Sequence, residues 1–274
     1  MVVVVVVVVT GLLTAAGAGT GADLHLQHVR SSTPSRDYAV DLVDDGCLHI
    51  THPSADIHNN TARIQTAIDT VSASAHGGCV VVSGGDYLVQ TIFVKSNTTF
   101  RIEPDTRLVA LINVTLDAVV CVSAATNVTL EGGGTIYGSA EHAWRYYSDV
   151  DNRMDPIDGP RPFVLLVENS QDVVVRNLKL HNSSNWSFRM LRSKNIYVDT
   201  VDIYGDSRFP NNDGFDPESC TNVTLVNSFI NVADDGVCPK AADQPLRGLT
   251  VRNTTIRSGF VHVCLLLFSS RQQP

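Results

Sequence analysis

Positive charge is scarce in this 274-residue chain: lysine and arginine number 20 against 28 aspartates and glutamates, which gives a net charge of −8. Proteins that bind nucleic acid usually carry a basic surface, so this balance argues against such a partner. Lysine is rare, whereas Gly, Thr, Asn and Val are prominent, and this composition favours β structure over helix. An acidic sugar can still bind such a protein through a local basic cluster.

The chain also lacks a Cys-x-x-Cys pair, which argues against a zinc knuckle, and it lacks a long apolar segment. The apolar stretch at residues 2–13 is too short and too rich in Gly to span a membrane. Small residues follow it up to Ala22, as in a secretory signal, although no basic residue precedes it. We therefore expect residues 1–22 to be a signal peptide, the mature protein to be extracellular, and no membrane partner.

One four-residue pattern recurs along the chain: a turn-forming residue, an aliphatic residue, any residue, and a second aliphatic residue. Another aliphatic residue follows the last four copies after five residues. Successive copies are 45, 23, 27 and 26 residues apart, and 45 is about two periods. The copies begin at Asn127, Asp172, Asn195, Asn222 and Gly248.

This period predicts a solenoid without a helix in each repeat, because alternate strand residues point inward and Asn, Asp or Gly accommodates the turn. Leucine-rich repeats share the period, but their Leu spacing is absent. We predict an all-β parallel β-helix over residues 23–258, with a β-sandwich as the alternative. Residues 60–75 show helical spacing of apolar residues and should cap the open end, before a first strand near residues 77–82.

Six cysteines suit an exported protein, and some of them could form disulfides between neighbouring coils. Cys220 and Cys238 are 18 residues apart, and a coil spacing of about 4.8 Å lies within the Cα range of a disulfide. We predict this bond, with Cys47–Cys79 as a second candidate, and we assign no partner to Cys121 or Cys264.

Eight Asn-x-Ser/Thr sequons would be surface glycan acceptors in a secreted eukaryotic protein, and we expect a few to be used. Some of them arise simply because an Asn turn precedes a Val-Thr strand. The sequons begin at Asn59, Asn97, Asn113, Asn127, Asn182, Asn185, Asn222 and Asn253.

Three carboxylates occupy two short strings, Asn-Asn-Asp-Gly-Phe-Asp at 211–216 and Ala-Asp-Asp-Gly-Val at 233–237. Asp213 precedes Asp234 and Asp235 by 21 and 22 residues, about one repeat, so the three should lie on neighbouring coils. Hydrolysis of a glycosidic bond uses one protonated carboxyl and one carboxylate, and crowding of acids should raise at least one pKa.

Adjacent strand residues point to opposite faces, so both acids of the second string can serve only if the backbone bends, as Gly236 would allow. Asn211 and Asn212 could either hydrogen-bond sugar hydroxyls or hold the aspartates in place. The alternative interpretation is that these Asp and Asn residues form turns or a calcium site.

These strings resemble those of glycoside hydrolase family 28, the polygalacturonases and their pectin-degrading relatives, which carry Asn-Thr-Asp-Gly-x-Asp and Asp-Asp-Cys/Gly-aliphatic. Three upstream segments are also similar, and the resemblance runs from about residue 40 to 258. They are the helix segment at 62–69, the Gly-rich turn at 132–138, and Asn-Ser-Ser-Asn-Trp at 182–186.

The resemblance implies a right-handed parallel β-helix and hydrolysis of α-1,4-galacturonosidic bonds with inversion. It makes Asp234 the general acid, and Asp213 and Asp235 the residues that hold and deprotonate the attacking water. It implies no metal and no cofactor. We expect a monomer whose partner is an anionic polysaccharide.

Galacturonate carries a carboxylate, which requires a basic side chain nearby. Lys240 matches a family lysine and Arg208 precedes the first string, although each could be a solvated surface charge. Trp186 could support a sugar ring, but it could equally be a buried core residue. These three and the two asparagines are the predicted substrate contacts.

Family members continue for several more coils after this point, whereas residues 259–274 form an apolar tail that breaks the repeat. We interpret the tail as the product of a shortened or misassembled gene model, with a capping strand as the alternative. We accordingly expect this chain to be poorly stable, and weakly active or inactive.

Competing functions on the same fold are a pectate lyase or pectin esterase, a rhamnogalacturonan-type hydrolase, and a non-catalytic carbohydrate-binding β-helix. A lyase needs calcium-binding acids with an Arg base, so the two aspartate strings favour hydrolysis. The sequence does not decide between endo and exo attack.

Overall fold

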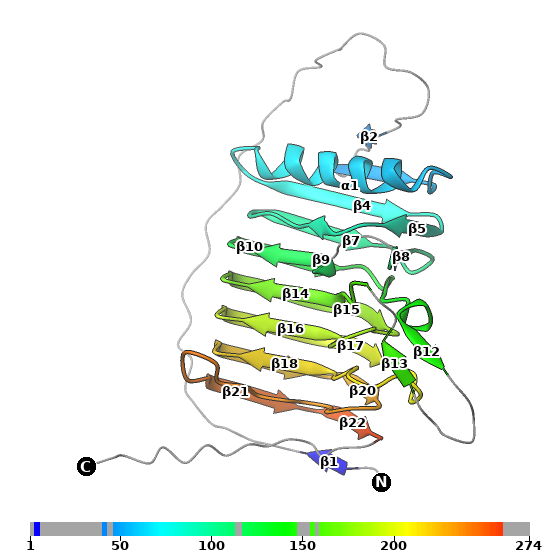
Figure 1. Ribbon diagram of the computed structural model, residues 1–274. Helices are drawn as coiled ribbons and strands as arrows, with labels where there is room; N and C mark the ends of the chain where they lie inside the picture. Colours follow the sequence, from blue (N-terminus) through cyan, green and yellow to red (C-terminus); the bar gives the residue numbers. More distant parts are fainter. Residues whose placement is uncertain are drawn as a thin grey trace, which may run out of the picture.

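The computed structural model describes residues 3–5, 40–42, 46–112, 117–146, 154–156 and 159–259. Within these ranges, parallel strands stack coil on coil into a solenoid, with one helix across its top (Figure 1). The predicted parallel β-helix with an N-terminal capping helix is therefore confirmed. No helix among the described residues is both long and apolar enough to cross a membrane.

The smaller of the two sheets that form the solenoid has five parallel strands, in the order β18-β16-β14-β9-β6. Its strands are β6 (Ile92–Phe93), β9 (Ala118–Ser123), β14 (Phe163–Glu168), β16 (Phe188–Leu191) and β18 (Phe215–Glu218). A two-stranded hairpin projects beside the solenoid (Figure 1) and consists of β12 (Trp144–Tyr146) and β13 (Met154–Pro156).

The larger sheet has 15 strands and bends along its length, so it supplies the other walls of the solenoid. Its N-terminal part contains β2 (Val40–Leu42), β3 (Cys47–Thr51), β4 (Gly78–Ser83), β5 (Asp86–Val89), β7 (Thr98–Ile102), β8 (Arg107–Ala110), β10 (Thr126–Glu131) and β11 (Thr135–Tyr137). Its C-terminal part contains β15 (Gln171–His181), β17 (Lys194–Tyr204), β19 (Thr221–Val226), β20 (Phe229–Val232), β21 (Arg247–Arg252) and β22 (Thr254–Ser258).

The repeat read from the sequence sets the register of this sheet. The first aliphatic residues of the five copies pair in order across β10, β15, β17, β19 and β21: Val128, Val173, Ile196, Val223 and Leu249. The turn-forming residue before each of them has a left-handed backbone, with φ between 56° and 67°. The apolar residues therefore stack into one continuous core, as the pattern predicted.

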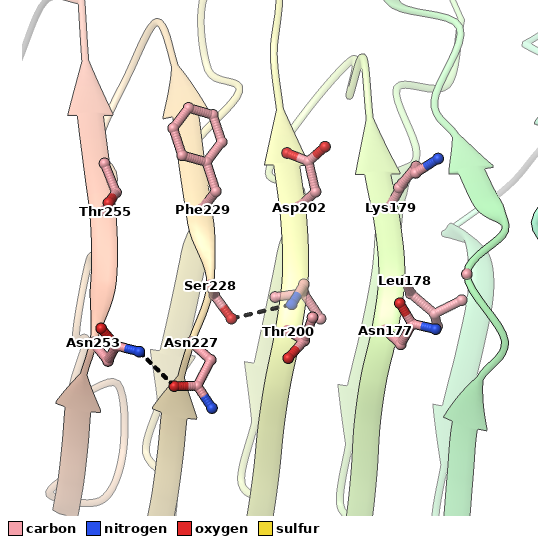
Figure 2. A pocket seen from close by; sticks show the side chains of 12 residues that line it. Asn177, Leu178, Lys179, Thr200, Asp202, Asn227, Ser228, Phe229, Asn253 and Thr255 are labelled. Carbon is pink, nitrogen blue, oxygen red and sulfur yellow. Dashed lines mark hydrogen bonds between the residues drawn. The ribbon is translucent and has the colours of Figure 1, made fainter.

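Asparagines at the turns form ladders along the outside of the solenoid. Asn222 Nδ2 donates to Asn195 Oδ1 at 2.9 Å, and Asn195 Nδ2 donates to Asp172 Oδ1 at 2.7 Å. At the outer bend, Asn253 Nδ2 donates to Asn227 Oδ1 at 2.7 Å (Figure 2). Several predicted glycan acceptors belong to these ladders, and their glycosylation stays a prediction.

Helix α1 (Ile57–Ser72) covers the first coil (Figure 1). Asp56 caps its N-terminus by accepting a hydrogen bond from the His58 amide at 3.0 Å. The predicted apolar stripe faces the core, because Ile64, Ala67, Ile68 and Val71 are all buried. The expected first strand is not the first, however, since β3 precedes the helix and pairs in parallel with β4.

The disulfide of the structure is Cys47–Cys79, which joins residues in register on β3 and β4 with a Cα–Cα distance of 4.7 Å. The predicted Cys220–Cys238 bond is wrong: both residues are buried free thiols. The register explains the error. The bridges Phe215–Val237 and Glu218–Lys240 place residues 22 apart side by side, so Cys238 lies beside Asp216.

The last described coil ends with β22, and β1 (Val3–Val5) pairs antiparallel with it. Val3–Val5 belongs to the predicted signal peptide, whose other residues lie outside the described ranges. Of the predicted tail at 259–274, only Gly259 is described, and sequon residue Asn113 is also outside. The predicted division of the chain at residues 22 and 258 therefore stays a prediction.

Candidate active site

The two aspartate strings lie side by side at the edge of the five-stranded sheet. The bridges from β18 to residues 237–240 have an offset of 22, which places Asp213 level with Asp235 on the next coil. The Gly214 amide donates to Asp235 O at 2.8 Å and fixes this register. The prediction that the strings occupy neighbouring coils is confirmed.

Asp234 is held by main-chain donors on both sides. The Asn211 amide donates to its Oδ2 at 3.2 Å, and the Asp235 amide donates to its Oδ1 at 3.0 Å. The hydroxyl of Ser258, on the following coil, donates to Asp234 O at 2.7 Å. Asp234 and Asp235 are both partly exposed, but Asp235 Oδ1 is buried, so only part of that carboxyl group is accessible from outside the sheet.

Asn212 holds the aspartates in place, which is the second of the two roles considered for it. Its Oδ1 accepts hydrogen bonds from the Ala233 amide at 2.8 Å and the Asp234 amide at 3.1 Å. Its Nδ2 donates to Asp206 O at 3.0 Å, and the residue is 0% exposed. Asn212 therefore joins the two aspartate strings and cannot reach a sugar, which corrects its prediction as a substrate contact.

Three glycines allow this close packing. A Cβ on Gly205 would collide with the Asn212 side chain, and one on Gly236 would collide with Ile256. A Cβ on Gly214 would lie 2.5 Å from Gly236 O. Gly236, expected to permit a bend, is thus required mainly because the next coil leaves no room for a side chain.

A buried ionic cluster lies beneath the aspartates. Lys240 Nζ hydrogen-bonds Asp216 Oδ1 and lies 3.5 Å from Asp213 Oδ2. The Lys240 side chain is 25% exposed, whereas Asp216 is fully buried and its Oδ2 has no hydrogen-bond partner. One ammonium therefore serves two carboxylates, and sequence reasoning missed Asp216 although it ends the first string.

Burial is the main cause of the pKa shifts in this cluster. It raises the pKa of Asp213; Lys240 opposes that rise, and Asp234 adds to it. Burial also raises the pKa of Asp216, again against the effect of Lys240. For Lys240 itself burial acts in the other direction, but the two aspartates outweigh it and raise its pKa. The expected raised carboxyl pKa is thus present on Asp213, and its first cause is burial, not crowding.

Cys238 completes the cluster, since ligand atoms of Asp213, Asp216 and Cys238 all lie within 4.8 Å of one another. Such a set could hold a metal ion, but the ammonium of Lys240 already lies among these groups. Burial and a contact with Asp235 raise the pKa of the Cys238 thiol to about 12, so it is neutral at ordinary pH. The expectation that no metal is needed stays a prediction.

Trp186 lies at the cluster and not in the core. Lys240 Nζ is 3.8 Å from the centroid of its ring, and the residue is partly exposed. The Phe163 ring also packs against Trp186, with a centroid distance of 5.8 Å. The structure thus brings Trp186 and Lys240 together beside the aspartates.

Arg208 faces a different hollow. Its side chain is 66% exposed and forms an ion pair with Asp206 at 2.6 Å. The cavity that it lines encloses about 430 Å³ and contains none of the three aspartates; its other lining residues are Tyr137, Glu141, His181, Asn182, Tyr204, Asp206 and Phe209. Arg208 therefore lines a cavity that contains none of the three aspartates, and Asp206 already neutralises its charge.

A second groove of about 430 Å³ follows the outer bend of the large sheet (Figure 2). Lys179, Asp202, Phe229 and Thr255 point outward from successive strands along it (Figure 2). None of the three aspartates lines this groove either.

Sequence reasoning also missed Arg161, which precedes β14. Its Nη1 donates to Asn211 Oδ1 at 3.3 Å, so the guanidinium lies against the first aspartate string. The guanidinium carbon is 4.7 Å from the centroid of the Trp144 ring. The only sequence signal was the pair of flanking prolines, Pro160 and Pro162, which suggests a rigid backbone but not a site.

Known proteins resemble this chain in sequence and in fold. A protein of Vitis vinifera named probable polygalacturonase is 25% identical over 239 residues, covering 76% of this chain and 48% of the relative. Exopolygalacturonase X of Aspergillus niger is 30% identical over 115 residues, covering 40% and 25%. The solved polygalacturonase of Erwinia carotovora has a TM-score of 0.64 at 20% identity, covering 76% of this chain and 61% of that one, and supports the fold.

This chain thus spans about half the length, or less, of the curated relatives that it matches. The family model for glycosyl hydrolases family 28 matches residues 72–260, which is more than half of the chain and includes both aspartate strings. The chain therefore belongs to glycosyl hydrolases family 28.

Proposed function

We propose that this protein hydrolyses the α-1,4-galacturonosidic bonds of pectin or polygalacturonate with inversion of configuration. The observation that carries the proposal is the register that sets Asp213 beside Asp235, with Asp234 fixed next to them by main-chain donors. Three carboxyl groups at one sheet edge can act on one glycosidic bond. Family membership and the polygalacturonase relatives support the same substrate class.

In the proposed reaction, Asp234 donates its proton to the glycosidic oxygen as the bond from that oxygen to the anomeric carbon breaks. Asp213 and Asp235 hold a water molecule, and one of them accepts its proton as the water oxygen bonds to the anomeric carbon. The proton gained balances the proton given up, and water arriving from the face opposite the leaving group inverts the anomeric centre.

Substrate contacts are assigned to Asn211, Lys240 and Trp186. Asn211 is exposed next to Asp234, and Lys240 is a partly exposed ammonium that lies 3.5 Å from Asp213. Trp186 supplies a partly exposed ring at the same place. Asn212 is excluded by burial, and Arg208 is a weaker candidate because Asp206 neutralises it.

The same proposal covers the setting of the enzyme. The protein is secreted after removal of residues 1–22, acts as a monomer, and needs no cofactor. Its partner is the anionic polysaccharide, and it uses neither nucleic acid nor a membrane.

The test is the release of reducing ends from polygalacturonate by the purified protein, with NMR of the first product to establish its anomeric configuration. Asp234→Asn should lower the rate about 10²- to 10⁴-fold, because general acid catalysis is lost. Asp202→Asn is the matched control, since Asp202 lies in the outer groove of Figure 2 and its loss should leave the rate unchanged. An unsaturated, ultraviolet-absorbing product would instead identify a lyase.

A further inference from the structure

Arg161 is a half-buried cation without an acidic partner among the described residues. Other partly buried cations near the site are paired: Lys240 with Asp216, and Arg189 with Glu218 at 2.7 Å. Burial lowers the pKa of Arg161, and no carboxylate of the described residues is a cause that counters this effect. A guanidinium held partly out of water without a counter-ion is costly, unless a ligand supplies the charge.

The position of Arg161 is fixed before any ligand binds. Asn185 Nδ2 donates to Arg161 O at 3.3 Å, and the Ser184 hydroxyl donates to Pro162 O at 3.1 Å. The guanidinium lies over the ring of the buried Trp144. A planar cation stacked on an aromatic ring loses little further freedom when it binds an anion.

Arg161 also has a short connection to the catalytic carboxyls. It donates to Asn211 Oδ1, while the amide of the same Asn211 donates to Asp234 Oδ2. A ligand held by Arg161 would therefore lie beside Asn211, the residue that hydrogen-bonds Asp234. A guanidinium has five N–H donors, and one bond to Asn211 leaves enough for a bidentate contact with a carboxylate.

We propose that Arg161 binds the carboxylate of a galacturonate residue adjacent to the bond that is cleaved, and so determines specificity for the acid over its methyl ester. This inference rests on the proposed function. Methyl esterification removes the charge and one of the two equivalent oxygens, so the ester cannot form the same bidentate pair.

The experiment measures binding of trigalacturonate and of its methyl ester by calorimetry, in an Asp234→Asn background that prevents turnover. Arg161→Gln should weaken binding of the acid about 10- to 100-fold and change binding of the ester little, since hydrogen bonds between charged groups are the strong ones. Arg161→Lys should keep part of the preference. Lys179→Gln is the control, because this exposed lysine lines the outer groove, which contains none of the three aspartates, and it should behave as the parent does.

Two results would overturn the inference while leaving the proposed function intact. One is an Arg161→Gln protein that still prefers the acid by the parental factor, and the other is an equal loss for acid and ester. A parent that binds acid and ester equally would also overturn the inference alone, whereas a parent that releases no reducing ends from polygalacturonate would overturn the proposed function. Circular dichroism and thermal melting of Arg161→Gln establish that the variant folds.

Discussion

The outer bend and the aspartate site use the same coil repeat in opposite ways. At the bend, Asn253, Asn227 and Asp199 stack on successive coils, and each amide donor meets an oxygen on the coil before it. At the site, Asp213 and Asp235 are also level on successive coils, but carboxylates cannot donate to each other when ionised. The polar groups of the exposed ladder hydrogen-bond one another, whereas the buried carboxylates of the site depend on one lysine for a positive charge.

The ladder contributes to the stability of the fold, whereas the aspartate site serves its chemistry. A ladder of amides that ends on a carboxylate adds small contributions, because each amide donor finds an oxygen on the neighbouring coil and the asparagines stay in contact with water. The aspartate site retains two buried carboxylate oxygens without a hydrogen-bond partner among the described residues, Asp216 Oδ2 and Asp235 Oδ1, and it contains groups whose pKa is raised by burial. Departures from full satisfaction of polar groups are expected where function, not stability, selects the residues.

The largest loss of stability in either region should come from replacing Lys240. Lys240→Met leaves Asp213 and Asp216 buried without a cation, and breaking a buried ion pair in this way costs about 3–5 kcal/mol. Urea denaturation at neutral pH measures the loss. The control is Lys179→Met in the outer groove, an exposed lysine whose loss should change stability by less than about 0.5 kcal/mol.

The pH dependence of the same variant has a defined sign. Both carboxyls have pKa values above their ordinary 3.8 in the folded protein, so their unfavourable contribution is absent at low pH and grows as the pH rises through the folded pKa. Lys240 lowers both pKa values, so its removal should increase this effect. Stability of Lys240→Met should therefore fall more steeply from pH 4 to 7 than that of the parent, and parallel curves would contradict the role given to Lys240.

A smaller effect should follow from replacing asparagines in the two regions. Asn212→Ala leaves one buried amide, one part-buried amide and one part-buried carbonyl without their partner, which should cost about 2–4 kcal/mol. Asn222→Ala removes an exposed ladder rung, where water can replace the amide, and should cost less than about 1 kcal/mol. Chemical denaturation of the two variants tests this difference, and equal losses of unfolding free energy would refute it.

The sequence predicted the fold well because the coil repeat is local and periodic. Every copy of the repeat has a turn-forming residue followed by aliphatic residues that point inward, at the same spacing. The register across β15, β17, β19 and β21 therefore followed from spacing alone. The cysteine prediction failed because spacing in sequence does not fix register at the other sheet. There the coil offset is 22, not the 18 that separates Cys220 from Cys238.

The site was predictable only in part, for a related reason. The aspartate strings carry a motif, but Asp216, Cys238 and Arg161 enter the site through pairing between coils or through a connecting segment. No pattern in the sequence says that Asn212 is buried while its neighbour Asn211 is exposed. That difference is decided by the packing of Gly205 against the Asn212 side chain.

Gly205 therefore offers the finest test of how the two regions differ. Gly205→Ala places a methyl group against the Asn212 side chain and should cost about 1–3 kcal/mol by overpacking. Gly248→Ala, at a ladder turn, has room for the methyl group but a φ of 67°, so it should cost about 1–2 kcal/mol through backbone strain.

Denaturation will give similar losses of stability for the two variants, but trigalacturonate binding will separate them. Displacement of Asn212 moves the amides that it holds at Ala233 and Asp234, so Gly205→Ala should weaken binding while Gly248→Ala does not. Unchanged binding in Gly205→Ala would mean that Asn212 does not position the catalytic string.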